Sequence, residues 1–235
     1  MNDIEKTENV ITTYKERSLH AALKNHFCPD ESMHELKMGK YVADACDGKT
    51  IFEIQTANLG KLSKKIDFYL ENTEYDLVVV HPIAKNRRIF WVDKESGEVN
   101  TASRLSSKHE SLCDGISNLY YIKDYIGKSR VSFCFPIMEI NETRYRDGYG
   151  KNKKIRATSV DRIAGEIYSI EYVKSVEDIR KYLNSVLPDG EFGRAELSKA
   201  LKLQGLKLWS AQKLLLELEI LSCHKDGNRL VFKKT

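Results

Sequence analysis

Two acidic residues and a glutamine lie close together on a stretch that has the pattern of two strands joined by a tight turn. Asp44 belongs to the first strand, Glu53 and Gln55 to the second, and Asp47-Gly48 stands between them. An Asp-Gly pair between apolar runs predicts a hairpin, and strand alternation puts Glu53 and Gln55 on one face. The hairpin therefore brings the Asp44 and Glu53 carboxylates close together.

Carboxylates beside an apolar strand pair are costly to bury unless they are paired with a cation or bind a metal. Mg²⁺ takes one or two carboxylates together with waters and substrate phosphate, and Mn²⁺ is its usual substitute. A cation held in this way polarises a phosphate and lowers the pKa of a bound water, which yields a nucleophile. The pattern Asp44, eight residues, Glu53-Ile54-Gln55 thus indicates metal-dependent phosphodiester hydrolysis.

The segments around this hairpin must position the two acids. Apolar residues at helical spacing predict helices before and after the hairpin, and short apolar runs predict buried strands beyond them. The order is that of an α/β protein with a mixed central sheet flanked by helices. The expected elements are a helix over 14–27, strands over 40–46 and 50–56, a helix over 58–71, and strands over 75–83 and 88–93.

The second half of the chain ends in a pattern of its own. Three helical patterns are followed by two strands around Asp226-Gly227, which is the layout of a winged helix. We therefore expect a nuclease-like domain over 1–140, a basic loop and linker helix over 141–175, and a winged-helix domain over 176–235. The expected elements are a helix over 116–126, a strand over 131–140, a loop over 144–156, a short helix over 160–169, helices over 176–187, 194–201 and 208–220, and strands over 221–224 and 229–233.

The acid pattern and its surroundings resemble the PD-(D/E)XK nuclease superfamily. More closely, the chain is similar to a family of prokaryotic proteins that pair a nuclease-like domain carrying an E-I-Q-T strand with a C-terminal winged helix. The resemblance covers nearly the whole chain and implies a restriction-endonuclease-like core. The matching runs are SLHAALK, GKYVADACDGKTIFEIQTANLGKLSKKI, VVVHPIAKNRRI, DGYGKNKKIRATSVDRI and EFGRAELSKAL.

The resemblance assigns roles residue by residue. Asp44 and Glu53 match the two metal-binding acids, and Gln55 stands where the motif usually has a lysine that positions or activates the attacking water. A glutamine orients water by hydrogen bonding but supplies no positive charge. A lysine from a neighbouring helix can supply that charge, and the candidates are Lys65, Lys64 and Lys24.

Further acids and bases flank the motif. Glu35 precedes the first strand of the pair and is a candidate third metal ligand, although a surface carboxylate is the simpler interpretation. Glu16, His20 and Lys24 are spaced i, i+4, i+8 and share one helix face. They are candidate phosphate or site contacts, and a solvated face with i,i+4 pairs is the alternative.

Basic residues gather where a nucleic acid would bind. The segment 144–156 carries six cations against one acid, with tyrosines between them, and suits phosphate contact and base stacking. A solvated charged loop is the alternative, and winged helices also mediate protein–protein contacts. The candidate nucleic-acid contacts are Arg144, Arg146, Lys151, Lys153, Lys154 and Arg156 in the segment, and Lys207, Lys213 and Arg229 in the winged helix.

Composition sets the outer bounds. The chain has 235 residues, 41% hydrophobic and 31% charged, which excludes a disordered chain and a disulfide scaffold. The net charge of +4 conceals −3 over 1–60 and +5 over each of 144–156 and 194–235. An acidic catalytic half beside basic segments favours a polyanionic partner.

The five widely spaced cysteines predict free thiols in a reducing compartment. The N-terminus lacks the apolar run of a signal peptide, and no stretch approaches the length of a membrane span. We therefore expect a cytoplasmic protein.

The sequence thus predicts a Mg²⁺-dependent DNA endonuclease that acts on double-stranded DNA, with a homodimer as an option and no membrane partner. Gln55 in place of lysine supports a second hypothesis, a catalytically inactive nuclease-fold protein that binds DNA or regulates. A protein-interaction module within a defence or repair complex is a third.

Overall fold

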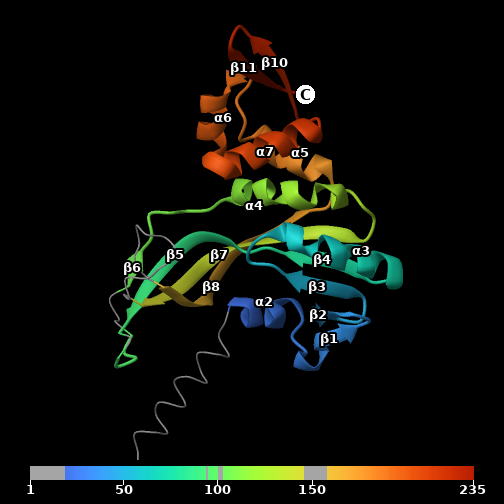
Figure 1. The fold of residues 1–235 in the computed structure, drawn as a ribbon, viewed down its shortest axis with the longest axis vertical. Coiled ribbons are helices and arrows are strands. Elements are labelled where there is room, and N and C mark those ends of the chain that lie inside the picture. Colours follow the sequence, from blue (N-terminus) through green and yellow to red (C-terminus); the bar gives the residue numbers. More distant parts are fainter. Residues whose placement is uncertain (1–18, 94, 100–102, 146–157) are drawn as a thin grey trace, which may run out of the picture.

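The computed structural model describes residues 19–93, 95–99, 103–145 and 158–235. It confirms the fold class: a mixed central sheet carries helices on both faces (Figure 1). Of the eight strands described in this sheet, β1 to β6 come from the N-terminal half of the chain and β7 and β8 from the rest. The strand order is β1 (His34–Met38), β2 (Tyr41–Cys46), β3 (Thr50–Ile54), β4 (Asp76–Val80), β7 (Val131–Tyr145), β5 (Ile83–Val92) and β6 (Arg104–Leu105), with β8 (Thr158–Val173) paired to β7.

The predicted hairpin is confirmed. β1, β2 and β3 run antiparallel, and the turn between β2 and β3 is fixed by its own side chain: Asp47 Oδ1 accepts from Lys49 N at 2.9 Å and Thr50 N at 2.7 Å. Gly48 has φ 89°, a left-handed backbone that glycine adopts without steric cost. The helix before the hairpin is α2 (Leu19–Phe27), and a 3-10 turn (Glu31–Met33) leads from it into β1.

The segment after the hairpin crosses over the sheet. A 3-10 turn (Leu59–Leu62) and α3 (Ser63–Asn72) connect β3 to β4, which pair in parallel, and β4 in turn pairs in parallel with the first residues of β7. β5 follows β4 along the same edge of β7. The carboxyl ends of β3 and β4 therefore meet at one edge of the sheet, which is where ligands bind in open α/β sheets.

The linker helix expected over 160–169 is wrong. These residues belong to β8, a strand of the main sheet, and Arg144 and Tyr145 end β7 instead of starting a loop. Apolar residues at 160, 163, 164, 167 and 170 have helical spacing. The β7–β8 ladder accommodates this spacing because its register shifts at three places. Instead of a single helix over 116–126, the chain forms α4 (Leu112–Leu119) and a 3-10 turn (Tyr120–Tyr125).

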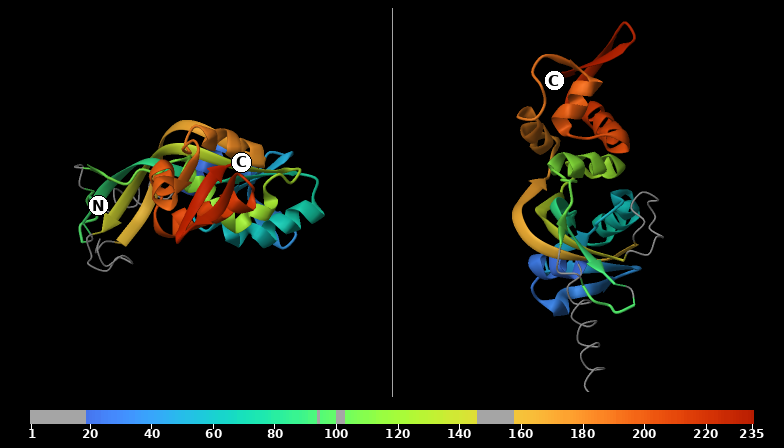
Figure 2. Two further views of the ribbon diagram at one scale, coloured as in Figure 1. Left: turned by 90° about the horizontal axis from the view of Figure 1, so that it is seen from above. Right: turned by 90° about the vertical axis from the view of Figure 1, so that its left-hand side faces the viewer.

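The sheet has two different apolar faces. One is covered by α2, where Leu19 and Leu23 pack with Phe52, Val80 and Met138. The other is covered by α3 and α4, and its core continues without a break into the C-terminal helices. Figure 2 shows this stacking from two further sides. In the part of the chain that is described, no helix is long and apolar enough to cross a membrane.

The C-terminal unit, residues 176–235, packs against α4 by means of its helix α7. It contains the three helices and two strands expected there, together with a short strand that the sequence pattern does not predict. That short strand, β9, completes a three-stranded sheet in the order β10-β11-β9. The elements are α5 (Val176–Asn184), β9 (Glu191–Gly193), α6 (Arg194–Leu201), α7 (Gly205–Glu217), β10 (Leu221–Asp226) and β11 (Arg229–Lys234).

Candidate active site

Asp44 and Glu53 lie where the β2–β3 hairpin stops pairing. The ladder joins Cys46 to Ile51 and Ala45 to Phe52, so the next cross-strand position belongs to the two acids. There the Asp44 carboxylate enters the ladder itself, since its Oδ2 accepts the backbone N–H of Ile54 at 2.7 Å. The expected juxtaposition of the two acids follows from this register.

Glu53 is buried, with 2% of its surface exposed, and two donors from α3 hold it. Lys65 Nζ lies 2.6 Å from Oε2, and the Tyr69 hydroxyl donates to Oε1 at 3.0 Å. Lys65 and Tyr69 are one helical turn apart, so both reach the same carboxylate. Burial, together with the charge of Asp44, raises the pKa of Glu53 to about 7, although Lys65 and Tyr69 favour the ionised form.

Asp44 is held from the opposite side of the sheet. His20 on α2 places its Nε2 3.3 Å from Asp44 Oδ2 and 3.1 Å from the carbonyl oxygen of Ile54. Burial acts to raise the pKa of Asp44, but the hydrogen bonds from His20 and from Ile54 N–H outweigh it and leave the pKa lowered. The same hydrogen bond raises the pKa of His20. The two neighbouring acids therefore have pKa values shifted in opposite directions: Asp44 favours its ionised form, and Glu53 gains a proton readily.

Gln55 follows the end of β3 and faces the loop after it. Its Nε2 donates to the carbonyl oxygens of Ala57 and Asn58, the latter at 3.2 Å. Its backbone carbonyl receives a hydrogen bond from the Nδ1 of His81. Gln55 thus fixes the loop beside the acids, and sequence reasoning expected it to orient water there instead.

Glu35 and Lys24 form an ion pair with each other at the surface, and 60% of the Glu35 side chain is exposed. Within the described residues, no group of three or more His, Cys, Asp and Glu side chains is arranged to hold a metal. Glu35 is therefore not gathered with Asp44 and Glu53 as a third ligand. His20 and Lys24 do share one face of α2, as their spacing predicts, and Glu16 lies outside the described residues.

Of the basic residues predicted to contact nucleic acid, some form ion pairs with acids, some are exposed, and some lie outside the described residues. Arg144 lies on β7 with its Nε 3.0 Å from Glu142 Oε1, and Lys207 Nζ lies 2.6 Å from Asp114 Oδ1, so an acid neutralises each of these cations. The expected phosphate-binding loop position of Arg144 is therefore wrong. Lys213 on α7 and Arg229 on β11 are exposed. The other predicted contacts lie outside the described residues: Arg146, Lys151, Lys153, Lys154 and Arg156.

A polar pocket of about 340 Å³ lies at the carboxyl ends of β3 and β4, and its lining includes Thr56 but neither Asp44 nor Glu53. One wall is the loop anchored by Gln55, and another is Leu19, the neighbour of His20 on α2. The remaining lining is mostly charged or amide. It includes His81, Arg87, Lys108, Glu110, Asp114, Asn118, Arg162 and Lys207.

Sequence reasoning missed Tyr69 and His81. The first has a local signal, since it stands four residues after Lys65 on a predicted helix. His81 has none, because its role depends on the meeting of two strand ends and α4. Its Nδ1 contacts the carbonyl of Gln55 and its Nε2 lies 3.0 Å from Asn118 Nδ2, while burial lowers its pKa and keeps it neutral.

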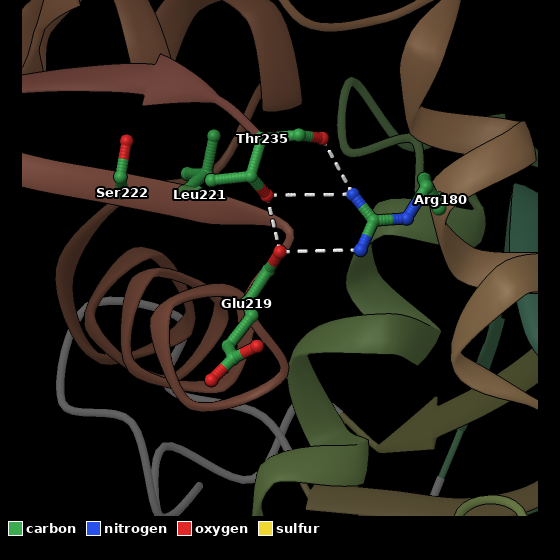
Figure 3. Close-up of a pocket in the computed structure, with 5 residues that line it drawn as sticks. All are labelled: Arg180, Glu219, Leu221, Ser222 and Thr235. Atoms are coloured by element: carbon green, nitrogen blue, oxygen red, sulfur yellow. Dashed lines mark hydrogen bonds between the residues drawn. The ribbon is translucent and has the colours of Figure 1, made fainter.

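A larger hollow of about 580 Å³ lies in the C-terminal unit, away from the acids. Figure 3 shows that Arg180 donates there to two backbone carbonyls: Nη1 to that of Thr235 at 2.7 Å and Nη2 to that of Glu219 at 3.1 Å. These bonds join α5 to the ends of α7 and β11. The hydrogen bonds in this hollow thus hold secondary-structure elements together.

The fold and site together define an α/β protein with a paired-carboxylate centre at the carboxyl edge of its sheet. The chain belongs to the family described as "Domain of unknown function (DUF8091)", which matches residues 17–174. It is also similar to a protein of Treponema pallidum (strain Nichols) described as "Uncharacterized protein". The two are 26% identical over 181 residues, which is 76% of this chain and 70% of that protein. No solved structure matches the chain.

Proposed function

We propose that this protein is a metal-dependent nuclease that hydrolyses phosphodiester bonds in DNA, with Asp44 and Glu53 at its centre. The observation that carries the proposal is the placement of these two carboxylates on neighbouring strands, with the cation of Lys65 against one of them at 2.6 Å. This is the combination of two acids and a basic group that the resemblance to PD-(D/E)XK nucleases implies.

The order of elements gives independent support. A helix, three antiparallel strands, a second helix and a strand parallel to the third follow one another from α2 to β4. That is the core order that the resemblance implies. The acids stand at the same end of this core as the polar pocket, where a ligand would enter.

The donor set fits a hard divalent cation. Mg²⁺ or Mn²⁺ takes one or two carboxylates and completes its shell with waters and substrate phosphate. Asp44 offers Oδ1, to which no described residue donates, and Glu53 would turn its oxygens from Lys65 and Tyr69. The cation, when bound, would supply Lewis acidity at the phosphate and an acidified water.

The protein's own groups have defined tasks in this proposal. Lys65 replaces the lysine that is missing at position 55, and its charge neutralises the developing negative charge near Glu53. His20 holds the Asp44 carboxylate in place through Oδ2. Gln55 fixes the wall between the acids and the pocket.

The C-terminal unit is proposed to be a winged helix that binds DNA. Lys213 and Arg229 are its exposed cations among the predicted contacts, and phosphate binding by them would weaken with salt. Double-stranded DNA could be cut by a homodimer, one site per strand. The five free cysteines support a cytoplasmic location, where thiols stay reduced.

A second function, binding DNA without cleaving it, is favoured by a specific observation. The amide donors of Gln55 are occupied by loop carbonyls, and both oxygens of Glu53 already have donors. A site that had lost catalysis could settle into this arrangement.

Incubation of supercoiled plasmid with Mg²⁺ or Mn²⁺ separates the two functions, with a gel shift in EDTA alongside. The nuclease proposal expects cleavage that disappears in Asp44→Ala and Glu53→Ala while DNA binding persists. Cleavage that survives both substitutions would refute the site. Salt-sensitive binding without cleavage in either metal would establish the second function.

A further inference from the structure

The lining of the polar pocket contains more cationic than anionic side chains, so its ion pairs leave some cations free. Arg87, Lys108, Arg162 and Lys207 line it against only Glu110 and Asp114. Four cations converge from four separate elements: β5, the segment before α4, β8 and α7. An arrangement of this kind suits an anionic group, and phosphate is the one that a nuclease substrate presents.

The cations differ in how firmly they are already paired. Arg87 reaches Glu142 at 3.4 Å and Glu110 at 4.0 Å, and Lys207 is held by Asp114 and Glu110. Lys108 is two-thirds exposed and 3.8 Å from Glu110. The Arg162 guanidinium forms no ion pair with any described residue. Arg162 and Lys108 are therefore the cations most available to a phosphate.

Two of the side chains that line the pocket, His81 and Asn118, are uncharged, and Asn118 offers hydrogen bonds. His81 is neutral and receives one N–H of Asn118 at Nε2. The amide oxygen of Asn118 and its second N–H form no bond with a described residue. An amide with a free donor and a free acceptor suits the edge of a nucleobase.

The size and position of the pocket restrict what can enter. About 340 Å³ is at the lower end of small-ligand pockets and holds one nucleotide. A base that is paired and stacked in a duplex stays outside such a pocket, whereas an unpaired base enters without the cost of unstacking. Leu19 lines the pocket, and the next residue of α2, His20, contacts Asp44, so the pocket lies one residue along α2 from the contact with that acid.

We propose that this pocket takes one unpaired nucleotide of the substrate strand, with its phosphate on Arg162 and Lys108 and its base against Asn118. This inference rests on the proposed function and adds to its substrate an unpaired nucleotide next to the cut, which an overhang, a single strand or a transiently opened base pair of supercoiled DNA supplies. The nucleotide arrives as part of a strand and not as a free mononucleotide.

Fluorescence anisotropy in EDTA tests the proposal without cleavage. The probes are a blunt duplex, the same duplex with a three-nucleotide overhang, and the single strand. We expect wild type to bind the overhang about tenfold more tightly than the blunt duplex, a gain equal to about 1.4 kcal/mol. Lys108→Ala/Arg162→Ala should lose this preference and lower the salt slope on the single strand by about 0.7 for the lost phosphate contact.

The matched control is Lys128→Ala/Lys181→Ala, which removes two exposed cations outside the pocket lining. It should keep the preference. Arg162→Lys, which retains the charge, should keep most of it, and thermal melts confirm that each variant is folded. Equal wild-type affinity for overhang and blunt duplex, or a preference that survives the double substitution, would overturn the proposal.

Two parallel measurements separate the remaining cases. If 5′-dAMP raises the melting temperature of wild type but the strands show no preference, the pocket binds free nucleotide and the proposal is wrong. Plasmid cleavage is scored on its own. Cleavage without an overhang preference overturns this inference alone, whereas a pocket-dependent preference without cleavage supports the pocket and refutes the nuclease activity.

Discussion

Replacement of Tyr69 by phenylalanine tests whether Glu53 is a buried acid held by donors from α3. The Tyr69 ring is 1% exposed and packs unchanged as phenylalanine, so the substitution removes only the hydroxyl that donates to Glu53 Oε1 at 3.0 Å. A hydrogen bond to a charged group contributes about 1.5–3 kcal/mol, and one between neutral groups about 0.5–1.5 kcal/mol. We expect Tyr69→Phe to lower the free energy of unfolding by about 2 kcal/mol at pH 8 and about 1 kcal/mol at pH 5.

The pH dependence follows from the pKa of Glu53. Its value of about 7 in the folded chain exceeds the ordinary 4.5, so the folded chain keeps a proton that the unfolded chain has lost. Stability that depends on this proton is full below about pH 4.5 and is lost as the pH rises through about 7. Without metal, the free energy of unfolding of wild type should therefore fall across this window, and Glu53→Gln should flatten the decline.

Urea denaturation followed by circular dichroism measures both effects in wild type, Tyr69→Phe, Glu53→Gln and the double variant. The double-mutant cycle isolates the coupling between the two side chains, which we expect to be about 1–2 kcal/mol at pH 8. Tyr75→Phe, on an exposed ring, is the control and should change stability by less than about 0.5 kcal/mol. The same loss at both pH values, or no coupling between Tyr69 and Glu53, would refute the reasoning.

Three further changes have defined outcomes. Lys65→Ala should slow Mn²⁺-dependent plasmid cleavage about 100-fold, and a rate equal to that of the exposed neighbour control Lys64→Ala would exclude a role for this cation. Lys207→Ala leaves the buried Asp114 and the partly buried Glu110 without their shared partner, so urea denaturation should show a loss of about 1–2 kcal/mol, and an unchanged midpoint would show that the bridge contributes nothing. Gly115→Ala puts a methyl 2.7 Å from the ring of Phe135. This overpacking should destabilise the fold by about 1–3 kcal/mol and lower the melting temperature. A rise in the melting temperature would mean that the ring moves aside freely.

The part of the site that is local in sequence could be predicted. The Asp47-Gly48 turn fixes the hairpin register, and that register alone places Asp44 beside Glu53. The helix spacing that brings Lys65 toward the hairpin is local in the same sense. Physical rules over four to ten residues were enough for these contacts.

The rest depends on contacts between distant segments. β8 has apolar residues at helical spacing, and only its bulged pairing with β7 makes it a strand. Lys207 looks like a surface cation in its helix, but α4 supplies Asp114 across the packed interface. His81 and the pocket around it exist because two strand ends and two helices meet there. No pattern within one element carries that information.

If Asp44 and Glu53 form a hydrolytic metal centre, the single-turnover rate of plasmid nicking in Mn²⁺ must depend on the Asp44 carboxylate. The comparison is between wild type, Asp44→Asn and Asp226→Asn, which makes the same change at an exposed strand position in the C-terminal unit. We expect metal-dependent nicking that falls at least about 100-fold in Asp44→Asn and stays within about twofold in Asp226→Asn. Equal nicking by wild type and Asp44→Asn, or none by wild type, would contradict it.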